Sequence, residues 1–214
     1  MVPSICNTGR GAMSPITFTQ QGIITQCELA KILIITSEGV LEVAFPLTDD
    51  DRRDMEIHLR GKFAGNLAFQ VKSTLHLAHR FRAYQLSMFF SVPKDRLITH
   101  PNFWYFFGYF DLKAMAFANP VFIVPSAEVH SHASPRLDGD RWTFNFSASL
   151  DPASQDHWVP FRAGTHEVGP RVLDIFANEQ VRRDASPLPA ALAELDGLVI
   201  VGQRAALAST GPAG

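Results

Sequence analysis

The chain has 214 residues, of which 46% are hydrophobic and 19% charged, and its formal net charge is −2. This is an ordinary globular mixture with enough apolar residues for one core. No apolar run approaches the length needed to span a bilayer, which excludes a membrane-spanning helical protein. We therefore expect a soluble, cytoplasmic protein that does not bind membranes.

The ends of the chain differ in composition from its middle. Residues 1–14 are polar, contain proline and glycine, and lack the apolar core of a signal peptide. We expect a flexible N-terminus over 1–15, one α/β domain over 16–184, and an Ala- and Pro-rich tail over 185–214, disordered at its end. The two cysteines, Cys6 and Cys27, are too few to predict a disulfide framework or a zinc site.

Positive charge gathers in one part of the sequence. Residues 52–96 hold nine Lys or Arg against three acids, a local balance of +6 in a slightly acidic protein. Such a stretch suits a polyanionic partner, although a solvated basic face is an alternative interpretation.

The first predicted element is a helix over 17–37. Ser14-Pro15 offers a cap and a first helical position, and Gly39 stands where helices end. Glu28 lies at helical spacing among three isoleucines, so this helix carries a carboxylate in its apolar stripe. A carboxylate is unusual in the apolar stripe of a helix, so Glu28 is a candidate functional residue.

Three strands are predicted next, over 40–47, 54–60 and 66–73. The last two alternate apolar and polar residues and are joined by a short turn, which predicts a hairpin. If Arg60 pairs with Asn66, Asp54 lies opposite Lys72. In that register the polar face presents an acid, an amide and an amine together, and a shift of two residues leaves them on the same face.

The remaining elements carry less information about function. We predict a turn at 49–51, a helix over 75–90 that ends by Pro93, and buried strands over 105–110 and 121–124, the first of which could instead be helical. We also predict a strand over 141–147, a helix over 167–178 capped by Thr165, and a small element over 192–201.

Three segments together resemble the PD-(D/E)XK nuclease superfamily. They are Glu28 on its helix, Asp54-Met55-Glu56-Ile57, and Phe69-Gln70-Val71-Lys72-Ser73. The resemblance covers about positions 16–130 and is to bacterial branches, some modification-dependent restriction enzymes among them, in which Gln replaces the acid of the triplet. It implies a restriction-endonuclease-like α/β fold with a mixed central sheet flanked by helices.

The resemblance also implies site residues and a reaction. Asp54, Gln70 and Glu28 match the metal-binding positions, and Lys72 matches the catalytic lysine beside them. Magnesium, with manganese as a substitute, would support hydrolysis of phosphodiester bonds in DNA. A homodimer or a protein partner that supplies specificity fits the same family. The alternative is a catalytically inactive nuclease-fold protein that binds nucleic acid or a protein.

Each of these residues also has a purely structural interpretation. Asp54 and Lys72 could form a cross-strand ion pair, and Glu28 could pair with Lys31 one turn on. Glu56 is a second candidate ligand on the same strand face. The candidates for contacts with the DNA backbone are Arg52, Arg53, Arg80 and Arg82.

The histidines predict no metal site on their own. His76 and His79 lack an acid at ligand spacing. His130 and His132 alternate in a predicted strand or loop, and the sequence offers them no third ligand.

Overall fold

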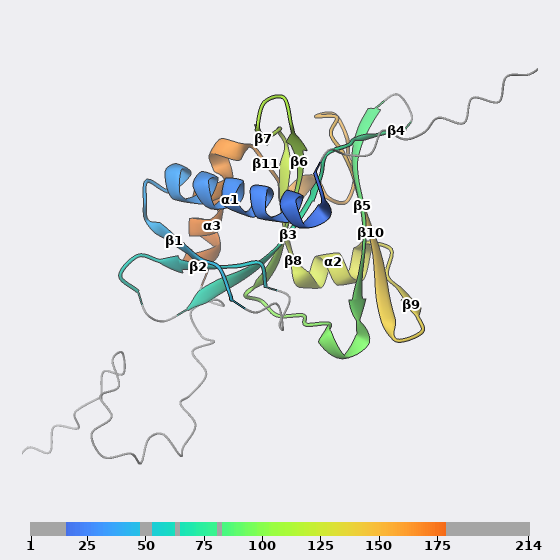
Figure 1. The fold of residues 1–214 in the computed structure, drawn as a ribbon, viewed down its shortest axis with the longest axis horizontal. Coiled ribbons are helices and arrows are strands. Elements are labelled where there is room, and N and C mark those ends of the chain that lie inside the picture. The colour runs from blue at the N-terminus through green and yellow to red at the C-terminus, as the bar shows by residue number, and fades with distance from the viewer. Residues whose placement is uncertain (1–15, 48–52, 63–64, 81–82, 179–214) are drawn as a thin grey trace, which may run out of the picture.

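The computed structural model describes residues 16–47, 53–62, 65–80 and 83–178. Two packed sheets form its centre, with helices around them (Figure 1). The helices are α1 (Phe18–Thr36), α2 (Ser126–His132) and α3 (Val168–Ala177), and the short 3-10 turns are η1 (Lys94–Arg96), η2 (Val159–Phe161) and η3 (Thr165–Glu167). The strands of the larger sheet are β1 (Leu41–Ala44), β2 (Met55–Leu59), β3 (Asn66–Thr74), β6 (Phe103–Asp111), β7 (Ala116–Phe117), β8 (Val121–Pro125) and β11 (Arg162–Ala163). Those of the smaller sheet are β4 (Ala78–Arg80), β5 (Ala83–Pro93), β9 (Arg136–Asp138) and β10 (Arg141–Ser149).

Helix α1 confirms the first predicted element. Thr17 Oγ1 accepts the Gln20 backbone N–H at 3.2 Å, and Gln20 Oε1 accepts the Thr17 N–H at 2.9 Å, which forms a capping box. The helix therefore begins one turn after Ser14-Pro15, and those two residues lie outside the described part of the chain. Beyond its end, Gly39 has the positive φ of +73° that the turn into β1 requires.

The larger sheet is mixed, as predicted for an α/β fold. Its order is β1-β2-β3-β6-β8-β11, with β2 and β3 antiparallel and β3 and β6 parallel. The predicted hairpin over β2 and β3 is confirmed, but its predicted register is wrong by two residues, because Asn66 pairs with His58 and not with Arg60. The side chains stay on the predicted faces, since only a shift by an odd number would reverse them.

The two faces of this sheet are covered differently. Met55, Phe69 and Val71 point toward α1 and α3, which lie on the left in Figure 1. The other face, which carries Phe107 and Phe122, packs against α2 and the smaller sheet. Helices therefore lie on both faces of the sheet, as predicted, and strands β5 and β10 cover much of the second face beside α2.

The predicted helix over 75–90 is wrong. The chain forms β4 and β5 there, and β5 buries Leu86, Met88 and Val92 at strand spacing against the larger sheet. Phe89, which is exposed, interrupts the apolar alternation in the sequence and obscured the period of two. Pro93 ends the element as predicted.

The later predictions are confirmed for the strands and adjusted for the last helix. The strands expected over 105–110, 121–124 and 141–147 correspond to β6, β8 and β10. Thr165 opens η3, and α3 follows from Val168 without a side-chain cap. The predicted turn at 49–51, both domain boundaries and the element over 192–201 lie outside the described residues. Within the described ranges, none of the helices combines the length and apolar character needed to cross a bilayer.

A histidine network joins α2 to the larger sheet. His130 Nδ1 lies 2.7 Å from Thr99 Oγ1, and His130 Nε2 lies 3.0 Å from the Tyr105 hydroxyl. Burial lowers the pKa of His130 from 6.5 to about 4, because the charged imidazolium would lose its hydration there. The imidazole is therefore neutral at physiological pH, with one nitrogen donating and the other accepting.

We predict that this histidine makes stability depend on pH. In the unfolded chain His130 takes up a proton near its ordinary pKa of 6.5, whereas in the folded chain it does so only near 4. The free energy of unfolding should therefore fall as the pH is lowered between these values. Urea denaturation at about pH 7 and about pH 5 should show a smaller fall for His130→Gln than for the wild type. An equal fall in both proteins would contradict the prediction.

We also predict that Gly169 is required by the contact between α1 and α3. A Cβ added there would lie 2.5 Å from Thr36 Oγ1 and 2.6 Å from the Ser37 backbone nitrogen. Gly169→Ala should lower the free energy of unfolding by about 1–3 kcal/mol. Gly22→Ala is the matched control, because its added Cβ would meet nothing within 4 Å beyond its chain neighbours and the backbone of its own helix. That change should be neutral or stabilise by about 0.5–1 kcal/mol in urea denaturation.

Candidate functional site

The candidate site is an open cleft between the first half of α1 and the edge of β3. Strand β2 begins at Met55, opposite Phe69, whereas β3 continues to Thr74. The cleft has a volume of about 540 Å³, and Asp54, Gln70 and Lys72 all line it. The structure thus brings together three of the four residues that the sequence proposed as a site.

Asp54 is held directly against β3. Its backbone N–H donates to the Phe69 carbonyl at 2.9 Å. Its carboxylate oxygen Oδ2 accepts two hydrogen bonds, from Gln70 Nε2 at 2.6 Å and from the Val71 backbone N–H at 2.7 Å. Because the observed register differs from the predicted one, the residue beside Asp54 is Gln70 and not Lys72.

Gln70 is buried at the bottom of this arrangement, with 7% of its surface exposed. Its amide nitrogen is placed on Asp54 because a carboxylate can only accept, which leaves the amide oxygen as the atom able to meet a cation. The Val71 N–H points toward Asp54, and in an extended strand the carbonyl of the same residue points to the same edge. The cleft thus offers carboxylate, amide and backbone oxygens.

Lys72 extends from the same face of β3 as Gln70, toward the smaller sheet. Its Nζ lies 5.6 Å from the centroid of the Phe90 ring, a cation–π contact across the space between the sheets. The parallel pairing of β3 with β6 places Lys72 beside Phe107. The ammonium group is therefore half-buried and held over an aromatic surface, with the cleft on its other side.

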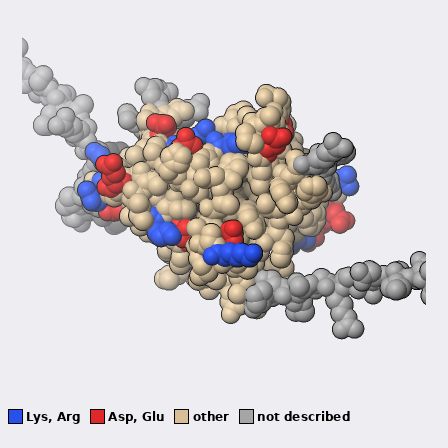
Figure 2. Space-filling model, turned by 90° about the horizontal axis from the view of Figure 1, so that it is seen from above, with Lys and Arg blue, Asp and Glu red and all other residues tan. Residues whose placement is uncertain are grey.

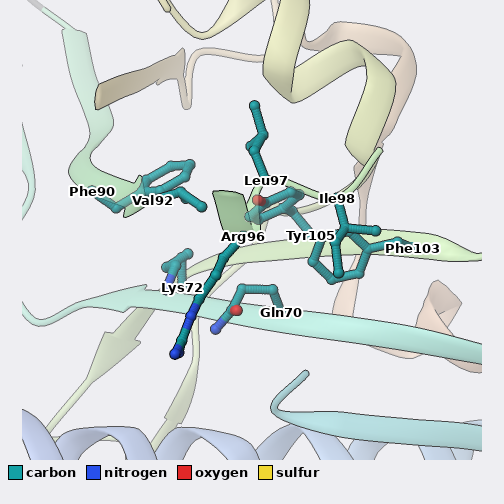
Figure 3. A pocket seen from close by; sticks show the side chains of 9 residues that line it. All are labelled: Gln70, Lys72, Phe90, Val92, Arg96, Leu97, Ile98, Phe103 and Tyr105. Carbon is teal, nitrogen blue, oxygen red and sulfur yellow. The ribbon is translucent and has the colours of Figure 1, made fainter. Parts of the chain in front are cut away.

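Arg96 is a site residue that the sequence analysis missed. A small cavity of about 10 Å³ is lined by Gln70, Lys72, Arg96 and Tyr105, among others. Figure 3 shows the Arg96 side chain extending from η1 past Lys72 and Gln70. No local pattern marks this arginine, because it reaches the site only through the path of β5 back over the larger sheet.

Three polar side chains fix the position of α1 beside the cleft. Gln21 Nε2 donates to the Ser73 carbonyl at 2.9 Å and contacts Ser73 Oγ at 3.0 Å. Ser73 Oγ donates to Thr25 Oγ1 at 3.1 Å. These bonds tie the first half of the helix to the end of β3, next to the residues that line the cleft.

Glu28 is not among the residues that line the cleft. Its carboxylate oxygen Oε2 lies 2.5 Å from Lys31 Nζ, which is the structural interpretation that the sequence allowed. Only 10% of the Glu28 side chain is exposed. The role of Glu28 as the helix acid stays a prediction.

The proposed DNA-contacting arginines are only partly placed. Arg53 Nη1 forms an ion pair with Glu56 at 2.6 Å, and Glu56 also lies 3.7 Å from His58 Nε2, so this second candidate ligand has two basic neighbours. Arg52 and Arg82 lie outside the described residues, and for Arg80 only the backbone in β4 is described. On the face shown in Figure 2, Lys and Arg stand in small groups beside Asp and Glu, between large uncharged areas.

The sequence matches no protein-family model and no curated protein. Among solved structures, it is similar to a bacterial homing endonuclease, I-Ssp6803I. The TM-score is 0.43 at 13% sequence identity, over 74% of this chain and 97% of that one. A likeness at this level carries no argument about activity, so the functional argument rests on the residues of the cleft.

The contact between Asp54 and Gln70 predicts a pH-dependent effect of Gln70→Glu. The new carboxylate would face Asp54 Oδ2, where an amide nitrogen now lies at 2.6 Å. We expect the variant to lose about 1–3 kcal/mol of unfolding free energy at neutral pH, and less under mildly acidic conditions, because the two carboxyls can then share a proton. Urea denaturation across this pH range measures the difference.

Gln155→Glu is the control for this substitution, because Gln155 is exposed and does not line the cleft. It should change stability by less than about 0.5 kcal/mol. If Gln70→Glu behaves in the same way at every pH, its side chain does not lie against Asp54.

Proposed function

We propose that this chain hydrolyses phosphodiester bonds in DNA with a divalent cation, as an endonuclease-like enzyme. The observation that carries the proposal is the convergence of Asp54, Gln70 and Lys72 on one open cleft. These residue types match the needs of the reaction, because an acid can hold a cation while an amine offsets charge on the phosphate.

The donor atoms fit a hard cation such as Mg²⁺. Magnesium prefers oxygen ligands, commonly one or two carboxylates completed by waters and substrate phosphate oxygens. Asp54 would supply the anionic ligand, with Gln70 Oε1 and the Val71 carbonyl as neutral ones. When bound, the ion would neutralise phosphate charge and make a water more nucleophilic, and Mn²⁺ would serve in its place.

Lys72 and Arg96 would act on the substrate. Both line the small cavity beside Gln70, so they could present positive charge toward a phosphate held at the cleft. The Phe90 ring beneath Lys72 excludes water from one side of the ammonium group, which strengthens its interaction with charge that develops in the transition state. Lys72 would also orient the attacking water, as the catalytic lysine of the resembled superfamily implies.

One observation also supports the alternative, a catalytically inactive protein with a nuclease fold. Gln70 stands where an acid would complete the metal site, and its amide already donates to Asp54 at 2.6 Å. A site with one carboxylate binds divalent ions more weakly than a site with two. In this alternative the domain binds nucleic acid or a protein partner without cleaving, and the basic segment around Arg53 supplies contacts to the phosphate backbone.

A plasmid-cleavage assay with Mg²⁺ or Mn²⁺ tests the proposal. The wild type should nick or linearise the DNA, and Lys72→Ala should lower the rate by about 10²–10⁴-fold. Asp54→Asn should lower it by a similar factor, because it removes the anionic ligand while keeping an acceptor for the two β3 donors. Lys113→Ala, which changes an exposed lysine outside the cleft, should cleave like the wild type.

The outcomes separate the two functions. Equal cleavage by the wild type and by both cleft variants would mean that the activity belongs to a contaminant and would refute the site. If the wild type does not cleave DNA with either Mg²⁺ or Mn²⁺, yet binds DNA with an affinity that falls steeply with salt, the binding alternative holds. Sedimentation of the protein with and without DNA would show whether two copies assemble, as cutting both strands would favour.

A further inference from the structure

Three side chains outside the cleft form a second cluster of metal-ligating groups. Glu128 and His132 lie one turn apart on α2, and His157 lies between β10 and η2. Glu128 Oε2 is 3.2 Å from His132 Nδ1 and 3.1 Å from His157 Nε2. One ligand atom from each residue lies within 4.8 Å of the other two. The fold thus gives His132 two further ligands, Glu128 and His157, in place of His130.

Both segments that carry the cluster are firmly packed. On α2, the buried Ser126 Oγ donates to the His100 carbonyl at 3.0 Å and accepts the His100 N–H at 3.1 Å. Beside His157, Trp158 is 5% exposed, and its ring lies 4.7 Å from that of Phe146. The backbones are therefore held in place, and only the three side chains would need to adjust around an ion.

The second segment is also fixed by its own hydrogen bonds. Asp156 Oδ2 accepts the Ser149 N–H at 2.6 Å, and Asp156 Oδ1 accepts the Trp158 N–H at 3.0 Å. These bonds clamp the turn that presents His157 toward α2. Because this backbone is already ordered, less conformational entropy is lost when a ligand binds.

The imidazoles approach each other as well as the carboxylate. Their rings stack at 4.1 Å between centroids, with 27° between the planes. A neutral imidazole carries a lone pair on one ring nitrogen, and that nitrogen can ligate a metal. Both rings direct a nitrogen at the same oxygen of Glu128, and an ion that enters between these atoms would meet two nitrogens and one oxygen.

We propose that Glu128, His132 and His157 bind a divalent transition-metal ion of the zinc class. Two imidazoles and one carboxylate form a ligand set that Zn²⁺ accepts, with a fourth position left for a water. Magnesium and calcium prefer all-oxygen sites, so this ligand set selects a different class of ion from the cleft at Asp54. The bound ion would cross-link α2 to the segment between β10 and η2.

Zinc binding by the untagged full-length chain tests this proposal. Isothermal titration with Zn²⁺ alone, without magnesium or DNA, should give one ion per chain, and Co²⁺ should give the visible absorption of a low-symmetry site. His132→Ala and His157→Ala should each weaken Zn²⁺ binding at least about tenfold. Glu128→Gln, which keeps the size of the side chain, should weaken it in the same direction.

Two control variants separate this site from the rest of the chain. His76→Ala removes an exposed histidine whose hydrogen bonds with Thr74 are made by its backbone, and it should bind Zn²⁺ like the wild type. Asp54→Asn should also bind Zn²⁺ normally, because the cluster shares no residue with the cleft. The test of the zinc site is therefore independent of whether the chain has nuclease activity.

The decisive comparison uses the double variant His132→Ala/His157→Ala. Circular dichroism should show that it stays folded, since both side chains are exposed. If this variant binds Zn²⁺ with the affinity and stoichiometry of the wild type, the ion lies elsewhere and the proposal is overturned. The same holds if the wild type binds no Zn²⁺ at all.

Discussion

The parallel pairing of β3 with β6 governs how the chain packs around the candidate cleft. Two parallel neighbours need a connection that crosses back over the sheet. Here β4 and β5 make that crossing, and together with β10 and β9 they form the smaller sheet. The crossing covers the face that carries Gln70 and Lys72, so the ammonium of Lys72 lies against an aromatic ring and not in open water. The same crossing places η1, and therefore Arg96, beside Gln70 and Lys72.

The cleft exists because β2 and β3 differ in length on one side. Past Phe69, the edge of β3 is met by the Asp54 carboxylate and by the first half of α1. A carboxylate that satisfies a strand N–H and a side-chain amide is held at a defined point, as a metal ligand must be. The same hydrogen bonds would also suit a purely structural acid. What distinguishes the functional interpretation is that Lys72 and Arg96, which come from two different elements, line one small cavity with Gln70, the residue that donates to Asp54.

The two candidate sites differ in how the chain builds them. The cleft draws on adjacent strands and one helix, so most of its residues lie in consecutive segments of the sequence. The cluster at Glu128 joins a helix to a turn 29 residues further along, through side chains that do not belong to one motif. Ligand chemistry divides them as well, because oxygen donors suit hard cations and imidazoles suit zinc. One small chain thus presents two separate and chemically distinct places where an ion could bind.

The elements that show a clear period follow from the amino-acid sequence alone. These are α1, the β2–β3 hairpin, the buried strands β6, β8 and β10, and the shared face of Gln70 and Lys72. Period-two alternation determines which face of the sheet a side chain occupies, and a register error of two residues does not change that face. Asp54 and Gln70 therefore still meet. The remaining features arise from packing between layers. Burial of the inner face of β5 against the larger sheet overrode the helical interpretation of 75–90, and the packing of distant segments brought Arg96 to Lys72 and His157 to Glu128. Contacts between residues far apart in the chain leave no local period, because they are selected by how whole layers pack and not by the residues on either side.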